Sequence, residues 1–173
     1  MNIKTPSGPR VATLVGPYTS GKTSLLESIL SLSDTIVRKG TVKEANMVGD
    51  ASLEAKARQM STELNVASCR YLDESWTFLD CPGSVELSQD RLNAALVADI
   101  TIVVCEADPD EAVTVAPILK QLEAENIPHM LFINKMDASA GSVREMLGAL
   151  QEISERPLVL HEIPIRDNDG ISG

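Results

Sequence analysis

Aromatic residues are scarce in this sequence: they make up 3% of its 173 residues, with one tryptophan, two tyrosines and two phenylalanines. Aliphatic side chains must therefore fill the core. Long hydrophobic runs are also lacking, since no apolar segment approaches the roughly 18 residues that a membrane-spanning helix needs. The opening residues, MNIKTPSGPRVATLV, contain no basic segment followed by a long apolar one. We therefore expect neither a secretory signal nor a membrane anchor.

Positive charge and cysteine are in short supply as well. The chain has 15 lysines and arginines against 25 aspartates and glutamates, a formal net charge of −10. Because affinity for nucleic-acid phosphates comes mainly from clustered lysine and arginine, this balance argues against a broad nucleic-acid-binding surface. Cys69, Cys81 and Cys105 are odd in number and lie in or beside apolar segments. Reduced, buried thiols in a cytoplasmic protein explain them better than disulfides or a metal cluster.

Segments with strand and helix periodicity alternate along the chain, which has the length of one domain. The pattern predicts strands at 10–15, 64–72, 76–80, 100–107, 129–134 and 157–165, the second and third forming a hairpin that turns at 73–75. It predicts helices at 23–32, 85–98 and 142–154, another beginning near Val113 with Pro117 in its first turn, and a possible short helix at 51–60. The apolar runs 100–107 and 129–134 are typical of buried parallel strands. This order predicts an α/β fold with a doubly wound, mainly parallel sheet.

The stretch GPYTSGKT, residues 16–23, fits the phosphate-loop pattern G-x-x-x-x-G-K-[ST] at every fixed position. It follows a predicted strand and opens a predicted helix, a context that disfavours an ordinary glycine-rich turn. Glycines let the backbone amides point at phosphates, Lys22 can reach the β- and γ-phosphates, and Thr23 can bind Mg²⁺. We expect a P-loop NTPase three-layer sandwich with one antiparallel edge strand. The residues expected around the nucleotide phosphates are Tyr18, Thr19, Ser20, Gly21, Lys22, Thr23 and Ser24.

The tetrapeptide NKMD, residues 134–137, follows another predicted strand, where an open α/β sheet places its ligands. The Asp137 carboxylate can accept hydrogen bonds from both N1–H and the N2 amino group of guanine, whereas adenine presents an acceptor at N1. Lys135 can lay its aliphatic stem along the base, and Asn134 can tie this loop to the phosphate loop. In isolation the match could be a polar turn, but its position downstream of a phosphate loop favours guanine.

A third loop begins at Asp80, the last residue of the predicted strand WTFLD. Asp80 can hold Mg²⁺ through a water, and Gly83 can offer its amide to the γ-phosphate. A D-x-x-G turn is common, so it is informative only together with the other two loops. The remaining Mg²⁺ ligand should be a hydroxyl from residues 38–63; Ser61 is the leading candidate, with Thr62 and Thr41 as alternatives.

These residues resemble the nucleotide-binding domain of elongation factor G and its relatives among ribosome-associated GTPases. The resemblance covers nearly the whole chain and is carried by GPYTSGKTSLLESIL, MVGDASLEAKARQMSTELNVAS, FLDCPG, VVCEA and LFINKMD. It implies a Mg²⁺-dependent GTPase that hydrolyses GTP to GDP and acts as a conformational switch on the ribosome. It also implies that Ser61 stands where the family has its Mg²⁺-binding threonine. We expect a monomer.

Two departures from the family bear on hydrolysis. Thr19 stands where the family's phosphate loop usually has aspartate, and Ser84 stands where the family has the histidine that positions the attacking water. The candidate catalytic residues are therefore Lys22, Gly83 and Ser84. The alternative function is a GTP/GDP-binding regulatory module with little hydrolysis of its own, while a P-loop ATPase or kinase is disfavoured by Asp137.

The last residues, VLHEIPIRDNDGISG, resemble the family segment that leads into an inserted subdomain. In the family, the final guanine-binding loop lies beyond that insertion. The SAG stretch at 139–141 follows NKMD with no strand between, so it is not that loop. We therefore expect residues 1–173 to be one GTP-binding domain, an N-terminal fragment of a longer protein that lacks the last guanine loop.

Overall fold

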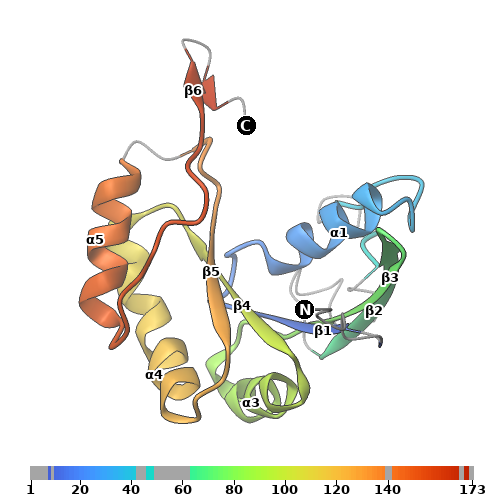
Figure 1. Cartoon of the computed structure of the whole chain (residues 1–173), viewed down its shortest axis with the longest axis horizontal. Helices are drawn as coiled ribbons and strands as arrows, with labels where there is room; N and C mark the ends of the chain where they lie inside the picture. The colour runs from blue at the N-terminus through green and yellow to red at the C-terminus, as the bar shows by residue number, and fades with distance from the viewer. Residues whose placement is uncertain are drawn as a thin grey trace, which may run out of the picture.

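The computed structural model describes residue 8 and residues 10–41, 46–48, 63–138, 142–167 and 170–171. Its centre is a five-stranded sheet with the strand order β2-β3-β1-β4-β5 (Figure 1). The parallel pairs are β1 with β3, β1 with β4 and β4 with β5, whereas β2 pairs with β3 antiparallel at one edge. The strand bounds are β1 Arg10–Val15, β2 Asn65–Tyr71, β3 Glu74–Asp80, β4 Ile100–Glu106 and β5 His129–Asn134. The mainly parallel sheet with one antiparallel edge strand is confirmed.

Helices cover both faces of this sheet. Helix α1, Lys22–Leu32, packs Leu26 and Leu30 against Leu14 and Phe78 on one face. Helices α3, α4 and α5 contribute to the cluster on the other face (Figure 1). Their bounds are Ser88–Val97, Ala116–Ala124 and Val143–Ile153. The layers are those of the predicted α/β sandwich.

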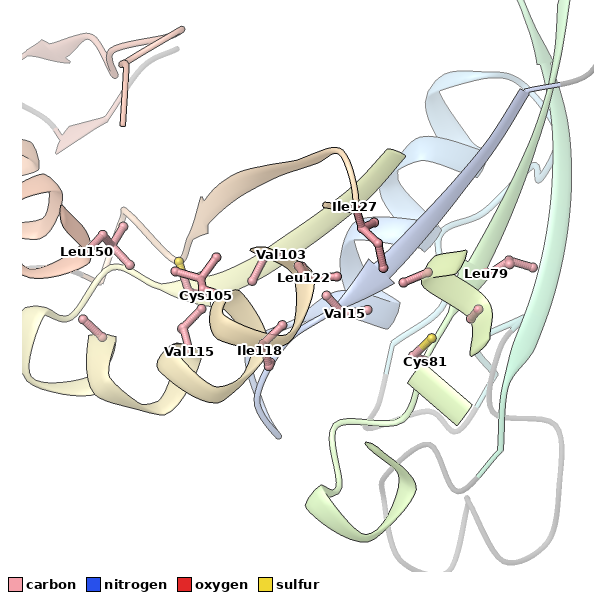
Figure 2. Packing of buried hydrophobic residues seen from close by; sticks show 14 of the residues in the cluster. Val15, Leu79, Cys81, Val103, Cys105, Val115, Ile118, Leu122, Ile127 and Leu150 are labelled. Carbon is pink, nitrogen blue, oxygen red and sulfur yellow. The ribbon is translucent and has the colours of Figure 1, made fainter. Parts of the chain in front are cut away.

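The core is aliphatic, as the shortage of aromatic residues predicted. Figure 2 shows the larger cluster, in which Val103 and Cys105 of β4 lie among residues of α4 and α5 such as Leu122 and Leu150. In the part of the chain that the structure describes, Phe78 is the one aromatic side chain among the buried core residues. All three cysteines are buried and unpaired with one another.

Two helices begin later than predicted, because a 3-10 turn precedes each. The predicted helix 85–98 divides into the 3-10 turn Val85–Leu87 and α3. The 3-10 segment Pro109–Val115 precedes α4, so that helix begins at Ala116 and not near Val113, with Pro117 in its first turn. Proline is tolerated there because the first backbone N–H groups of a helix have no partner within it.

The β2–β3 hairpin turns one residue earlier than predicted. Its two-residue loop is Leu72–Asp73, since Tyr71 pairs with Glu74. Both loop residues have positive φ, 49° and 63°, the geometry of a tight turn whose twist matches the strands it joins. The predicted turn at 73–75 assigned two strand residues to the loop.

The predicted strand over 157–165 is wrong. This segment joins no ladder; short strands follow it instead, β6 Arg166–Asp167 pairing with β7 Gly170–Ile171. Pro157 and Pro164 have no N–H to donate, and side chains such as Val159 are exposed. Strand β5 is consequently a partly buried edge strand of the described sheet, not a strand covered on both sides.

A buried carboxylate holds the chain where it leaves α1. Glu27 is 1% exposed and accepts hydrogen bonds from the backbone N–H groups of Gly40, at 2.7 Å, and of Val48. Met47 packs beside this contact and is 5% exposed. The predicted short helix at 51–60 lies outside the described residues.

Candidate nucleotide-binding site

The three loops singled out in the sequence meet at one edge of the sheet, where the parallel strands end. Strand β1 leads into the loop 16–21, β3 ends at Asp80 and β5 ends at Asn134. Registers place Leu14 beside Asp80 and Glu106 beside Asn134, so these strand ends are neighbours. Ligands of open α/β sheets bind at this edge.

Lys22 closes the phosphate loop on itself. As the first residue of α1, it donates from Nζ to the carbonyl oxygens of Gly16, at 3.1 Å, and Pro17, at 2.8 Å. The side chain is buried, and burial lowers the pKa of Lys22 while the nearby Asp80 acts in the opposite direction. A buried ammonium surrounded by loop carbonyls suits a ligand that brings negative charge.

Glycines allow the loops to approach this closely. A Cβ at Gly16 would lie 2.1 Å from the carbonyl oxygen of Val104, and φ is +151° there. A Cβ at Gly83 would lie 2.8 Å from both Lys22 Nζ and the backbone nitrogen of Tyr18. The loop that follows β3 therefore rests directly on the phosphate loop. This brings Gly83 against Lys22, two of the three candidate catalytic residues.

Thr23 and Asp80 provide two oxygen ligands at one point. Thr23 Oγ1 donates to Asp80 Oδ2 at 2.7 Å, and Asp80 is fully buried. A hydroxyl and a carboxylate are hard ligands of the kind that Mg²⁺ uses together with substrate phosphates, so these residues fit that ion. Among the described residues, no group of three or more His, Cys, Asp or Glu could hold a metal ion. Ser61 and Thr62 lie outside the described residues; Thr41 is exposed, and its N–H donates to Asn46.

Ser84 has a local structural role. It is the N-cap of the 3-10 turn Val85–Leu87, and its Oγ accepts a hydrogen bond from the N–H of Glu86 at 3.3 Å. The side chain is half-buried. The hydroxyl at this position thus satisfies a backbone donor of its own loop.

The base loop contacts the phosphate loop through Asn134, whose Nδ2 donates to the carbonyl oxygen of Ser20 at 2.9 Å. Lys135 adopts φ 57°, and Asp137 lies exposed in the turn that follows. In the phosphate loop, Tyr18 and Thr19 are exposed, Ser20 is buried and Ser24 lies in the first turn of α1. The structure thus brings both ends of the candidate site together, apart from the position of Ser61.

Sequence reasoning missed Glu106, the last residue of β4. Its Oε1 accepts from Lys135 Nζ at 2.6 Å and from Thr19 Oγ1 at 3.2 Å. The available signal was a carboxylate at the end of the apolar run ITIVVCE, at the same sheet edge as Asp80 and Asn134.

A P-loop fold with a guanine-type base loop at this edge defines a GTP-binding domain. The family described as "Elongation factor Tu GTP binding domain" matches residues 9–165, and the chain belongs to it. Within the described residues, no helix is long and apolar enough to cross a membrane.

The chain is also similar to individual proteins. It is 46% identical over 173 residues to an "Elongation factor G-like protein" of Synechocystis sp., covering all of this chain and 26% of that protein. It is 28% identical over 169 residues to an "Elongation factor G-like protein" of Mycobacterium tuberculosis, covering 97% of this chain and 23% of that protein. The crystal structure of ttk003000868 from Thermus thermophilus superposes with a TM-score of 0.85 and 26% identity, covering 95% of this chain and 24% of that one. The chain spans about a quarter of the length of these relatives.

Proposed function

We propose that this chain is the GTP-binding domain of a longer translation-factor-like GTPase, which hydrolyses GTP to GDP and acts as a switch on the ribosome. The observation that carries the proposal is the meeting of the three loops: Gly83 rests on Lys22, and Asn134 binds Ser20. The similarity to elongation factor G-like proteins supports the ribosome as partner. Buried, unpaired thiols are compatible with a cytoplasmic monomer.

In the proposed reaction, the oxygen of a water molecule bonds to the γ-phosphorus, and the bond from that phosphorus to the oxygen that bridges to the β-phosphate breaks. GDP leaves with the bridging oxygen, and the γ-phosphoryl group leaves as inorganic phosphate that carries the water's oxygen and proton. Lys22 leaves the carbonyls of Gly16 and Pro17 to bind the β- and γ-phosphate oxygens, and the loop amides with Gly83 N–H bind the charge that develops. Thr23 and Asp80, with Ser61 as a further ligand, would hold Mg²⁺. When bound, that ion neutralises phosphate charge. Asn134, Lys135 and Asp137 would bind guanine.

A second candidate is a guanine-nucleotide-binding module with little hydrolysis of its own. The observation that favours it is the Ser84 hydroxyl, which caps the following turn and offers the attacking water no imidazole. Both candidates require guanine-nucleotide binding and differ only in turnover.

Calorimetry with GDP, GTP and ATP tests guanine-nucleotide binding, which both candidate functions require. We expect GDP and GTP to bind and ATP to give no heat, because Asp137 faces donors in guanine and an acceptor in adenine. Equal binding of ATP would contradict the guanine assignment. Single-turnover hydrolysis of GTP by a longer protein that contains this chain, with and without ribosomes, then separates the two candidates. GTP left intact after long incubation with ribosomes would eliminate the enzyme.

A further inference from the structure

Glu106 joins the two loops that would hold the two ends of a nucleotide. It ends β4, between β1 and β5, which lead into those loops. One carboxylate oxygen, Oε1, accepts both from Lys135 Nζ of the base loop, at 2.6 Å, and from Thr19 Oγ1 of the phosphate loop, at 3.2 Å.

Both partners of Glu106 hold unusual backbone conformations. Thr19 has φ 64° and Lys135 has φ 57°, in the left-handed region that a side chain disfavours, most of all a β-branched one such as threonine. Residues in such conformations persist when surrounding contacts fix them. The Thr19 hydroxyl has a single proton, which it shares between the carbonyl oxygen of Tyr18, at 2.6 Å, and Glu106 Oε1, at the longer distance of 3.2 Å. The described contacts of the Lys135 side chain go to Glu106 alone.

We propose that Glu106 is a positioning residue for guanine nucleotides, which sets the base loop and the phosphate loop in their binding arrangement before the ligand arrives. The inference rests on the proposed function. Fixing both loops in advance reduces the ordering cost that binding must otherwise meet. Glu106 thereby forms a second connection between the two loops, in addition to the hydrogen bond from Asn134 to Ser20.

The negative charge of Glu106 opposes this gain, so the net effect of Glu106 on nucleotide affinity depends on which contribution is larger. A carboxylate near a nucleotide repels its phosphates, and its removal alone would strengthen binding. Here Glu106 forms an ion pair with Lys135 at 2.6 Å, with side chains 31% and 41% exposed, so its charge is already compensated. Without Glu106, Lys135 would regain its rotamer freedom and would have to be ordered by the nucleotide. We therefore expect the benefit of an ordered Lys135 to exceed the repulsion between Glu106 and the phosphates, so that Glu106 strengthens nucleotide binding.

The test measures GDP affinity by calorimetry in magnesium-containing buffer. Glu106→Ala should weaken GDP binding about 3- to 10-fold, the range of a partly exposed ion pair together with a hydrogen bond. Glu106→Gln should stay within about 2-fold of the original chain, because an amide oxygen can accept both hydrogen bonds and the charge of a partly exposed ion pair adds little. Unchanged thermal melting of both nucleotide-free variants would separate positioning from a general loss of stability.

Glu111→Ala is the matched control. It removes one negative charge from the 3-10 segment just beyond β4, at an exposed residue whose described hydrogen bonds use only its backbone. It should leave GDP affinity unchanged. A double-mutant cycle adds a second readout: in a Lys135→Met chain, Glu106→Ala should change GDP affinity less than it does when Lys135 is present.

The outcomes divide cleanly. Weaker GDP binding in Glu106→Ala, rescue in Glu106→Gln and no change in Glu111→Ala support the proposal. Unchanged or tighter binding in Glu106→Ala overturns it, as does an equal loss in Glu106→Gln, which would assign the effect to charge. If the original chain bound ADP as tightly as GDP, or bound neither, the proposed function would fail instead.

Discussion

The two ends of the candidate site are built in different ways. The phosphate end consists of backbone and buried charge: Lys22 is 6% exposed, Ser20 is 1% and Asp80 is 0%. The base end consists of exposed side chains, with Lys135 and Asp137 on the surface and Glu106 partly exposed. Buried groups therefore hold most of the phosphate end, whereas the base end depends on partly exposed side-chain contacts such as the Glu106–Lys135 ion pair.

Lys22→Ala should have the largest effect, because it removes the buried charge on which the phosphate end is built. Two charge-assisted hydrogen bonds to phosphate, at about 1.5–3 kcal/mol each, correspond to a loss of at least about 100-fold in GDP and GTP affinity. Calorimetry measures the loss. Lys120→Ala, at an exposed residue of α4, is the matched control and should bind normally. Retained tight triphosphate binding by Lys22→Ala would contradict the phosphate-loop assignment.

Asp137→Asn tests the base end and should have the next largest effect. An amide in place of the carboxylate puts a donor against the guanine donors. Two hydrogen bonds at this exposed residue, at about 1–2 kcal/mol each, correspond to a fall in GDP affinity of about 30- to 1000-fold. Xanthine nucleotides should then bind, because their extra oxygen pairs with the amide. Asp73→Asn, at the tip of the β2–β3 hairpin, is the control for lost charge. GDP affinity that stays unchanged in Asp137→Asn would mean that the base is read elsewhere.

The sequence predicted the phosphate end more completely than the base end. The phosphate loop is a local feature in which adjacent residues carry most of the geometry, so its pattern identifies Gly16, Gly21 and Lys22. Glu106 went unnoticed because its two partners lie 87 and 29 residues away and become neighbours only through the sheet register. The strand over 157–165 was predicted from apolar residues, but pairing also needs a buried face, which this segment lacks, and its two prolines remove backbone donors.

Glu27→Gln tests the contact that holds residues 40 and 48 to α1, the helix that begins at the phosphate end. The carboxylate accepts two backbone N–H groups, and an amide would turn one acceptor into a donor facing Gly40 or Val48. We expect a loss of about 1.5–3 kcal/mol in the free energy of unfolding, measured by urea denaturation. Glu152→Gln, at an exposed residue of α5, should cost little. An unfolding curve for Glu27→Gln that matches that of Glu152→Gln would show that the carboxylate does not hold this part of the chain.

The smallest expected effect concerns Cys81, the buried residue that follows Asp80 in the chain at the phosphate end. Burial raises the pKa of the Cys81 thiol to about 12, and the Asp80 carboxylate acts in the same direction. A raised pKa means that the folded state holds the proton more tightly than the unfolded state, in which the thiol titrates near 9.0. Stability from this group is therefore fully present below pH 9 and is lost as the pH rises from 9 towards 12.

At pH 10 the loss amounts to roughly 1 kcal/mol for one thiol. Cys81→Ala should consequently show a smaller fall in unfolding free energy between pH 8 and pH 10 than the original chain, by about that amount. Val103→Ala, a buried position with nothing to titrate, should lower stability equally at both pH values and leave the fall unchanged. If Cys81→Ala lost as much stability over this interval as the original chain, the thiol would be ionising without penalty. Cys81 would then be as accessible to water as the base end, which would contradict the conclusion that the phosphate end is the more buried of the two.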